Sequence, residues 1–541
     1  MTVVLGTNII SPLGRTSREN YESVKSGRSA LQRLDGWKGI PERITASVFG
    51  SSQCPDRRCY GFDAMAADSI EAALKGTGVD PASPGTVLIL STTKGDIDSL
   101  EPCTSESYRG PAEAARRIAG HFGMVTKPII VCNACISGGN AQLLAARLLE
   151  SGAYDNAIVC GADTVSAFTV AGFLSFKALS PFECRPFDIE RLGLNLGEAA
   201  ATMIFGRSAV GVEGRWTLEA GAQTNDAYHL SAPSPDGDGV FRALSVAAEG
   251  ISPDELDCIS LHGTATMFND QMESKAVQRA GLSDVPACAL KGYYGHTLGA
   301  AGLVETIIMM ESLEDGVVLP TRGFEELGVS GKISVSGEER SSAGKGRFIK
   351  VLSGFGGGNC ALRYCFAETA STMLPRTGDI EVLGRVRLDR DDDLEEIYRT
   401  KLESYPKFHK MDMLSKLSYV ASELLLKEAP GAKPSAVILF NGTSSIQQDR
   451  RHISAIMGPD GFFPSPSVFL YTLPNIAAGE IAIRNGIKGE TSLYILQDND
   501  SDLMDSIVRA SLPVGATAIS GWVDCCSDSM YEADLKLIKI N

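Results

Sequence analysis

Two cysteines lie close together in the stretch V-C-N-A-C-I-S-G-G-N-A-Q, residues 131–142, and either could supply a thiol for catalysis or metal binding. Cys132 and Cys135 have the spacing of thioredoxin-like redox pairs and of zinc half-sites, and the same spacing arises by chance. A zinc site needs a second ligand pair. Cys54 and Cys59 are too far apart in sequence for a zinc knuckle, and Cys525 and Cys526 are adjacent. We therefore expect no metal here, while a redox pair, a reactive thiol and plain packing stay open.

The residues around Cys135 predict a strand, a turn and then a helix. Residues 129–131 are apolar and β-branched, and the segment 139–150 has apolar residues at helical spacing. Cys135 is therefore expected at or just before a helix N-terminus, where unpaired N–H groups and the helix dipole favour a thiolate. Cys132, at the end of the strand, is expected to be buried.

Two of the six histidines stand in turns rich in Gly and Thr, each after a predicted strand. The turns read L-H-G-T-A-T around His262 and G-H-T-L-G-A-A-G around His296. One such histidine is usually a structural hydrogen-bonding residue, but two beside glycines that let the backbone approach a ligand indicate a site. A cysteine with two histidines fits a Cys–His hydrolase or an acyl transferase, and a hydrolase has no obvious use for the second histidine.

The elements that must position these residues alternate along the chain. Short β-branched runs predict strands at 87–90, 129–131, 157–160, 259–261 and 348–352. Segments of helical period lie at 64–75, 112–121, 139–150 and 303–313. This alternation predicts an α/β fold with largely parallel sheets covered on both faces. At 541 residues the chain is too long for one hydrophobic core, so two or three domains are expected.

The last 165 or so residues weakly echo an earlier part of the chain. Asp63 opens a predicted helix and Val87 begins a strand, and Asp412 and Val437 follow the same pattern at almost the same spacing. Farther on, a second match follows. A predicted helix with A-A-R at 145–147 and one with A-I-R at 482–484 are each followed by a Gly and then by a predicted strand. In this alignment the stretch F-L-Y-T-L-P-N-I-A-A-G lies opposite Cys135 and contains no Cys, so the tail is predicted to lack the nucleophile.

Composition excludes some classes of function. The formal net charge of −16 leaves no excess of Lys and Arg for general binding to nucleic acid or anionic membranes. The 13 cysteines are scattered without regular spacing, which favours reduced thiols and a cytoplasmic protein over a disulfide framework. No run approaches the roughly 20 apolar residues of a membrane span.

Six motifs, in order along residues 1–368, resemble those of the β-ketoacyl synthases, the condensing enzymes of fatty acid and polyketide assembly. They are S-P-L-G at 11–14, A-C-I-S at 134–137, C-R-P-F-D-I-E-R-L-G at 184–193 with L-G-E-A at 196–199, H-G-T-A-T at 262–266, K-x-x-x-G-H-T-L-G-A-A-G-x-x-E at 291–305, and G-F-G-G at 354–357.

The resemblance implies a thiolase-like fold of α-β-α-β-α layers made of duplicated halves, at about 1–210 and 211–368. A lapse in apolar periodicity predicts a linker at 369–378. Residues 379–541 then form a smaller α/β domain that resembles a nucleophile-free N-terminal half of the same fold and is expected to be non-catalytic.

The resemblance also implies a reaction: a decarboxylative Claisen condensation of a Cys-bound acyl group with a malonyl-type carrier thioester, giving a 3-oxoacyl-carrier protein. Cys135 would take the acyl group, and His262 and His296 would donate hydrogen bonds to the enolate oxygen of the extender. The backbone N–H groups of Cys135 and Phe355 would form the oxyanion hole, and Phe355 with Gly356 would gate the acyl pocket.

Supporting roles follow from the same motifs. Lys291 would support the electrostatics around His296, and Glu305 would hold the local hydrogen-bond network. Thr264 and Thr266 would contact the pantetheine arm. No metal or redox cofactor is implied, because phosphopantetheine arrives on a separate acyl carrier protein, and family members are generally homodimers.

Two alternatives remain at this stage. One is a non-catalytic subunit that resembles a chain-length factor, although Cys135 and both histidines argue against it for residues 1–368. The other is thiolase-type acyl transfer, for which Cys360, just after the Gly-rich loop, would serve as the second cysteine. Departures from the usual family motifs at Ile136 and Gly358 bear on acyl-chain preference rather than on the reacting groups.

Overall fold

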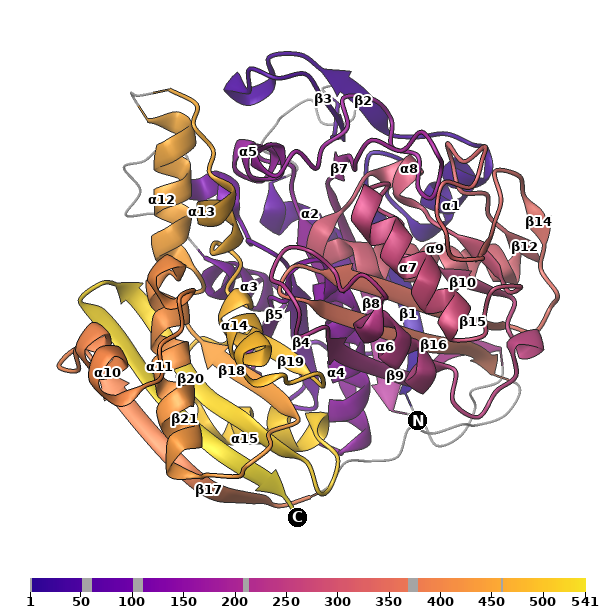
Figure 1. The fold of residues 1–541 in the computed structure, drawn as a ribbon. Coiled ribbons are helices and arrows are strands. Elements are labelled where there is room, and N and C mark those ends of the chain that lie inside the picture. Colours follow the sequence, from indigo (N-terminus) through magenta and orange to yellow (C-terminus); the bar gives the residue numbers. More distant parts are fainter. Residues whose placement is uncertain (1, 51–60, 101–109, 208–213, 368–377, 459–460) are drawn as a thin grey trace.

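The computed structural model describes residues 2–50, 61–100, 110–207, 214–367, 378–458 and 461–541 (Figure 1). The predicted linker at 369–378 lies outside these residues except for Gly378. Among the described residues, no helix has both the length and the apolar composition needed to cross a bilayer.

A sheet of 16 strands runs through the described structure and contains one five-strand pattern three times. In each group three neighbouring strands are parallel to one another. The fourth strand then pairs antiparallel with the third, and the fifth pairs antiparallel with the fourth. The first group, in sheet order, is β5 (Ile129–Val131), β4 (Thr86–Ser91), β6 (Asn156–Asp163), β8 (Ala199–Arg207) and β1 (Thr2–Ile10). The second is β11 (Pro286–Cys288), β10 (Cys258–Ser260), β15 (Arg347–Gly354), β16 (Gly358–Ala367) and β9 (Arg215–Asn225), with β13 (Ser334–Val335) outside it. The third is β19 (Thr491–Ile495), β18 (Ala436–Asn441), β20 (Thr517–Ser527), β21 (Met530–Ile540) and β17 (Ile380–Asp389).

Two helices fill the space between the first two groups. α4 (Ser137–Glu150) and α9 (Ala301–Glu314) contact each other, and both contact strands of the first and the second group. All of α4 from Ser137 to Leu149 is buried, as expected for a helix covered on every side. The sheet therefore folds back where β1 meets β9 and encloses these two helices as a middle layer.

The strands of the first group are covered on both faces. Val87 and Ile89 of β4 belong to the core around α4, whereas Leu88 and Leu90 belong to a core that includes α2 (Phe62–Leu74). Alternate residues of a strand point to opposite faces, so α2 and α4 lie on different sides of the sheet. In the second group α6 (Asp238–Ala247) packs on β9, β15 and β16. This is the predicted α-β-α-β-α layering.

Further helices and short strands complete the described chain. The remaining helices are α1 (Ser17–Lys25), α3 (Pro111–His121), α5 (Ala167–Ser175), α7 (Met267–Arg279), α8 (Lys291–Tyr294), α10 (Leu394–Lys401), α11 (Met413–Glu428), α12 (Ile446–Met457), α13 (Pro466–Leu470), α14 (Ile476–Asn485) and α15 (Ser501–Ser511). Short strands are β2 (Leu31–Leu34), β3 (Ile44–Ser47), β7 (Leu196–Gly197), β12 (Val317–Val318) and β14 (Arg340–Ser341).

The third group, with its helices, makes up the C-terminal unit, which we define as the described residues from 378 to 541. Its strand β19 pairs antiparallel with β5, and α15 packs against α4, so the unit lies directly beside the first group (Figure 1). Two buried ion pairs cross the boundary, Arg147 to Glu490 at 2.8 Å and Lys94 to Asp449 at 2.7 Å. The unit is thus packed against the rest of the chain through buried polar contacts as well as through the sheet.

The internal echo is visible in the strands. β1 and β17 hold the same place in their groups, and each has a bulge in the sequence V-L-G, between Val4 and Gly6 and between Val382 and Gly384. The later part of the sequence alignment is wrong, however. The A-I-R helix α14 precedes β19, which occupies the position of β5 rather than that of β6. The counterpart of the Cys135 turn is therefore residues 496–500, which also contain no Cys.

Candidate active site

Cys135 lies in a tight elbow between β5 and α4. It belongs to the 3₁₀ turn Ala134–Ile136, directly before α4, and the preceding Ala134 has a φ of +50°, a region that L-residues rarely adopt. The Ser137 side chain closes this elbow, because its hydroxyl donates to the Ala134 carbonyl at 2.6 Å and accepts from the Asn133 N–H at 2.8 Å. Gly138 is required here, since a Cβ on it would lie 2.8 Å from the Gly299 carbonyl oxygen.

The protonation state of Cys135 differs from the sequence-based expectation. Burial raises the pKa of the Cys135 thiol to about 12, although the Lys291 charge and the N–H groups of Cys135 and Phe355 act in the opposite direction. The cost of removing a thiolate from water is therefore larger than the stabilisation that the helix N-terminus gives to its charge. The resting group is a thiol, and its proton must leave as the sulfur attacks.

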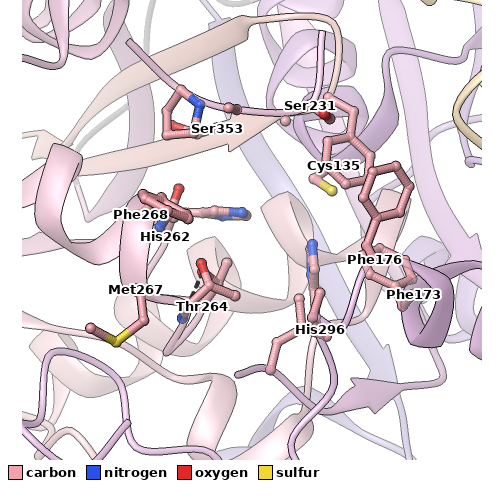
Figure 2. Close-up of a pocket in the computed structure, with 18 of the residues that line it drawn as sticks. Cys135, Phe173, Phe176, Ser231, His262, Thr264, Met267, Phe268, His296 and Ser353 are labelled. Atoms are coloured by element: carbon pink, nitrogen blue, oxygen red, sulfur yellow. Dashed lines mark hydrogen bonds between the residues drawn. The ribbon is translucent and has the colours of Figure 1, made fainter. Parts of the chain in front are cut away.

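The two histidines predicted for the site come together. His262 follows β10, and His296 follows α8; their ring centroids are 5.2 Å apart and their planes are nearly perpendicular, at 84°. The Glu273 carboxylate fixes the turn that carries His262, because it accepts hydrogen bonds from the N–H groups of His262 at 2.6 Å and Gly263 at 2.9 Å. Figure 2 shows Cys135, His262 and His296 facing a common space.

Hydrogen bonds define the tautomer of each ring. An ammonium group only donates, so Lys291 Nζ, 3.2 Å from His262 Nδ1, makes that nitrogen an acceptor and places the ring proton on Nε2. His296 Nδ1 accepts from the Leu298 N–H at 3.3 Å, so its proton is on Nε2 as well. Within the described part of the chain, the buried His296 Nε2 has no hydrogen-bond partner.

Both imidazoles are neutral. Burial lowers the pKa of His262 and of His296 well below the usual value, and the charges of Lys291 and Lys350 lower both further. The pocket therefore holds two neutral N–H donors, fixed in orientation and ready to bind an oxygen that becomes negatively charged.

A buried charge network lies behind the histidines. Glu305 accepts from Lys291 Nζ at 2.7 Å and also from Lys350 Nζ. Burial alone would raise the pKa of Glu305, but the two ammonium charges hold it below its usual value. Lys291 contacts His262 directly, because β11, which precedes Lys291, pairs with β10, which precedes His262. Its charge also lowers the pKa of His296, in line with the predicted electrostatic role there.

The turn between β15 and β16 carries the predicted gate. The Phe355 ring packs against Phe173 and Phe176, with centroid distances of 6.0 and 5.4 Å. Its N–H is close enough to the thiol of Cys135 to lower the pKa of that group, as an oxyanion-hole donor would. Gly356 has a φ of +88°, which a residue with a Cβ rarely adopts.

The main cavity at this site has a volume of about 420 Å³. Its lining includes Cys135, both histidines and Phe355, together with the exposed side chains of Met267 and Phe268. Thr264 and Thr266 also line it, and their hydroxyl oxygens are 2.8 Å apart. Among the described residues, no cluster of three or more His, Cys, Asp or Glu is arranged to hold a metal ion.

A second cavity, of only about 10 Å³, lies on the other side of Cys135 and Phe355. The C-terminal unit closes it with Phe469 and Leu473. The Phe469 ring packs so tightly on α5 that a Cβ on Gly172 would lie 2.1 Å from it.

Sequence reasoning missed several of these residues. Lys350 had one available signal, a lysine within the apolar run F-I-K-V-L. Glu273 follows the H-G-T-A-T motif in the same chain segment, but nothing local distinguishes it from a surface residue of α7. Phe469 had no signal, because its position depends on how the C-terminal unit packs.

The comparisons with known proteins agree with this geometry. Residues 2–209 match the family model of the beta-ketoacyl synthase N-terminal domain, and residues 217–325 match that of the C-terminal domain. The 3-oxoacyl-[acyl-carrier-protein] synthase 2 of Mycobacterium leprae is 32% identical over 290 residues, which cover 50% of this chain and 67% of the relative. The enzyme of the same description from Rhizobium meliloti is 26% identical over 410 residues, covering 66% of this chain and 97% of the relative.

Solved structures show the same fold. A β-ketoacyl synthase from Burkholderia phymatum has a TM-score of 0.60 and 23% identity, and the match covers 68% of this chain and 99% of that one. A structure described as the PfaC keto synthase-chain length factor has a TM-score of 0.76 at 14% identity, and the match covers all of this chain and 78% of that one. With the motifs, the pocket and both family models in agreement, this chain belongs to the β-ketoacyl synthase family of condensing acyltransferases.

Proposed function

We propose that the protein condenses a Cys135-bound acyl group with a malonyl-type carrier thioester and releases CO₂ and a 3-oxoacyl-carrier protein, as in fatty acid or polyketide and polyene biosynthesis. The observation that carries this proposal is the arrangement of one buried thiol and two neutral Nε2–H donors, from His262 and His296, around one cavity.

The first step is acyl transfer. The Cys135 sulfur attacks the carbonyl carbon of an acyl-carrier thioester, and a tetrahedral oxyanion forms between the N–H groups of Cys135 and Phe355. When this intermediate collapses, the bond to the pantetheine sulfur breaks and the carrier leaves as a thiol with the proton that Cys135 gave up.

The second step is decarboxylative condensation. The electron pair of the bond to the leaving CO₂ becomes an enolate on the extender, and its oxygen accepts from Nε2–H of His262 and His296. The enolate carbon attacks the acyl carbonyl on Cys135 in the same oxyanion hole. A carbon–carbon bond forms, the thioester bond to Cys135 breaks, and the thiolate takes up a proton.

Such a reaction requires no metal or redox group, because the carrier brings phosphopantetheine. Its arm would run through the 420 Å³ cavity past Thr264 and Thr266, and the acyl carrier protein would cover the mouth. A solved relative is described as an acyl-carrier protein in complex with its ketosynthase. The homodimer implied by the family stays a prediction; a second copy cannot add to the β5 edge, because β19 already pairs there.

Neither alternative is as well supported. A relative whose description includes a chain length factor matches the whole chain, and the C-terminal unit lacks a cysteine at the place of Cys135, but the first two strand groups retain every reacting side chain. The thiolase alternative needs Cys360 in the pocket. Cys360 is buried beside Gly139 and does not line the cavity, and burial raises its pKa to about 12.

Intact-mass spectrometry tests the nucleophile. Wild type incubated with an acyl-carrier thioester should gain one acyl mass, Cys135→Ala should gain none, and Cys132→Ala should behave as wild type. Acylation of the Cys135→Ala variant, or of no variant including wild type, would refute the assignment.

Release of labelled CO₂ from a malonyl-carrier thioester tests the histidines. We expect the variant His262→Ala with His296→Ala to lose about 10²-fold or more of this release, because both donors to the enolate oxygen are gone. Release at the wild-type rate would exclude the proposed role.

A further inference from the structure

Two parts of the chain hold the loop that carries Phe355. On one side the Gly356 N–H donates to the Leu230 carbonyl at 2.7 Å, and the Gly356 carbonyl accepts from Asn225 Nδ2 at 2.8 Å. On the other side the Phe355 carbonyl accepts from Asn475 Nδ2 at 2.9 Å. Asn475 belongs to the C-terminal unit, where it is the residue that precedes α14, and it is only 7% exposed. The peptide between Phe355 and Gly356 is therefore fixed at both of its polar atoms.

The first turn of α14 is seated directly on this loop. A Cβ on Gly479 would lie 3.0 Å from the Gly356 carbonyl oxygen, and a Cβ on Gly356 would lie 2.7 Å from Asn475 Nδ2. The Gly479 N–H donates to the Asn475 carbonyl at 3.0 Å, so the asparagine backbone is fixed by the helix. The absence of a side chain at both glycines lets the C-terminal unit reach the loop.

The orientation of this loop bears on the reaction. The N–H of Phe355 faces Cys135, and its carbonyl is the group that Asn475 holds. The two groups belong to successive peptide planes joined at the Phe355 Cα, so a displacement of the loop that carried the carbonyl away from Asn475 would also move the N–H donor. An oxyanion-hole donor is effective only when it is already aimed at the position that the oxyanion will occupy.

We propose that Asn475 is a positioning residue for acyl transfer: its amide holds the Phe355 carbonyl so that the Phe355 N–H points at the oxyanion formed on Cys135. The C-terminal unit thus takes part in catalysis without supplying a reacting group. This inference rests on the proposed condensing function.

The test compares full-length wild type with Asn475→Asp and Asn475→Ala in single-turnover acylation of Cys135 by an acyl-carrier thioester. Asp keeps the shape of Asn but places an acceptor against the Phe355 carbonyl. At about pH 8 we expect Asn475→Asp to acylate at least about tenfold more slowly, with the half-saturating carrier concentration unchanged within about twofold.

The pH profile separates positioning from general damage. A protonated Asp can donate again, so the rate of Asn475→Asp relative to wild type should recover toward about pH 5. Asn475→Ala has no group to protonate and should be slow throughout. If Asn475→Asp fails to fold, the Ala variant still measures the loss of the donor.

Asn485→Asp is the matched control. Asn485 is the last residue of the same helix and donates to Glu423 at 3.0 Å, away from the loop, so this variant should acylate at the wild-type rate. Wild-type rates for both Asn475 variants, or an equal loss in Asn485→Asp, would overturn the inference. Failure of wild type itself to acylate at Cys135 would instead overturn the proposed function.

Discussion

At the scale of single residues, the site depends on charges that are buried together. Glu305 joins Lys291, which contacts His262, to Lys350, which also donates to the carbonyls of Ser260 and Leu261 at 3.3 and 3.2 Å. The network thus ties the end of β10 to β15 and α9. It orients His262 and supplies positive charge that keeps both imidazoles neutral.

Removing one member of this network should be costly. We expect Lys350→Met to lower the free energy of unfolding by about 3 kcal/mol, because one Glu305 oxygen is left buried without its charge partner. Urea denaturation measures this, with Lys332→Met as the control because that lysine pairs with Asp284 on the surface. A loss below about 1 kcal/mol, as for surface pairs, would contradict it.

The thiol of Cys135 should show its raised pKa in its reactivity. Below a pKa of about 12 the thiolate fraction rises with pH, so alkylation of Cys135 by iodoacetamide should accelerate nearly tenfold per unit from about pH 7 to about pH 10. Peptide mass spectrometry, with Cys135→Ala to identify other modified thiols, follows the rate. A plateau near about pH 8 would show that the helix terminus, rather than burial, dominates.

At the scale of elements, local sequence was informative wherever one segment forms a feature by itself. The run at 87–90 lies within β4, the segment 303–313 lies within α9, and the turns after β5 and β10 place Cys135 and His262 as expected. Apolar periodicity and Gly-rich turns suffice for these elements because their geometry is set by neighbouring residues.

Contacts between distant elements were not predictable in this way. Phe469 meets α5 and Asn475 meets the Phe355 loop only because β19 pairs with β5, and no local pattern reports that pairing. The A-I-R helix was misaligned for a related reason: small apolar residues with one arginine suit many amphipathic helices, so the similarity carried no topological information.

Phe469 gives a prediction at this scale. Phe469→Ala should enlarge the 10 Å³ cavity behind Cys135 and shift acylation toward longer acyl chains, while the lost packing destabilises the protein by about 3 kcal/mol. Competition among acyl-carrier thioesters of increasing length, read by intact mass, measures the preference. The control is Phe463→Ala, since Phe463 is 69% exposed; an unchanged preference in Phe469→Ala would show that another side chain sets the limit.

At the scale of the whole molecule, the C-terminal unit covers a sheet edge that would otherwise be exposed. β5 is entirely buried, and Asn133, beside it, accepts from the Leu493 N–H at 2.8 Å. Without the unit, Arg147 and Lys94 would also lose their buried carboxylate partners. The exposed edge and the unpaired charges together make the stability of the first strand group dependent on the C-terminal unit.

A truncated chain should show this dependence. We predict that residues 1–367 expressed alone aggregate or self-associate, because the bare β5 edge pairs with other chains. Light scattering during size-exclusion chromatography, with the full chain as reference, measures the outcome. A monodisperse, monomeric fragment with wild-type acylation would show that the C-terminal unit is dispensable for folding and for catalysis.

The pairing of β19 with β5 has one more consequence. A pocket wall borrowed from a second chain is lost on dilution, because its occupancy follows the association equilibrium. Here Phe469 and Asn475 are tethered to the site they complete, so their local concentration is fixed by the chain and not by the solution. The specific activity of this synthase should therefore hold at protein concentrations where an assembly of separate subunits would fall apart.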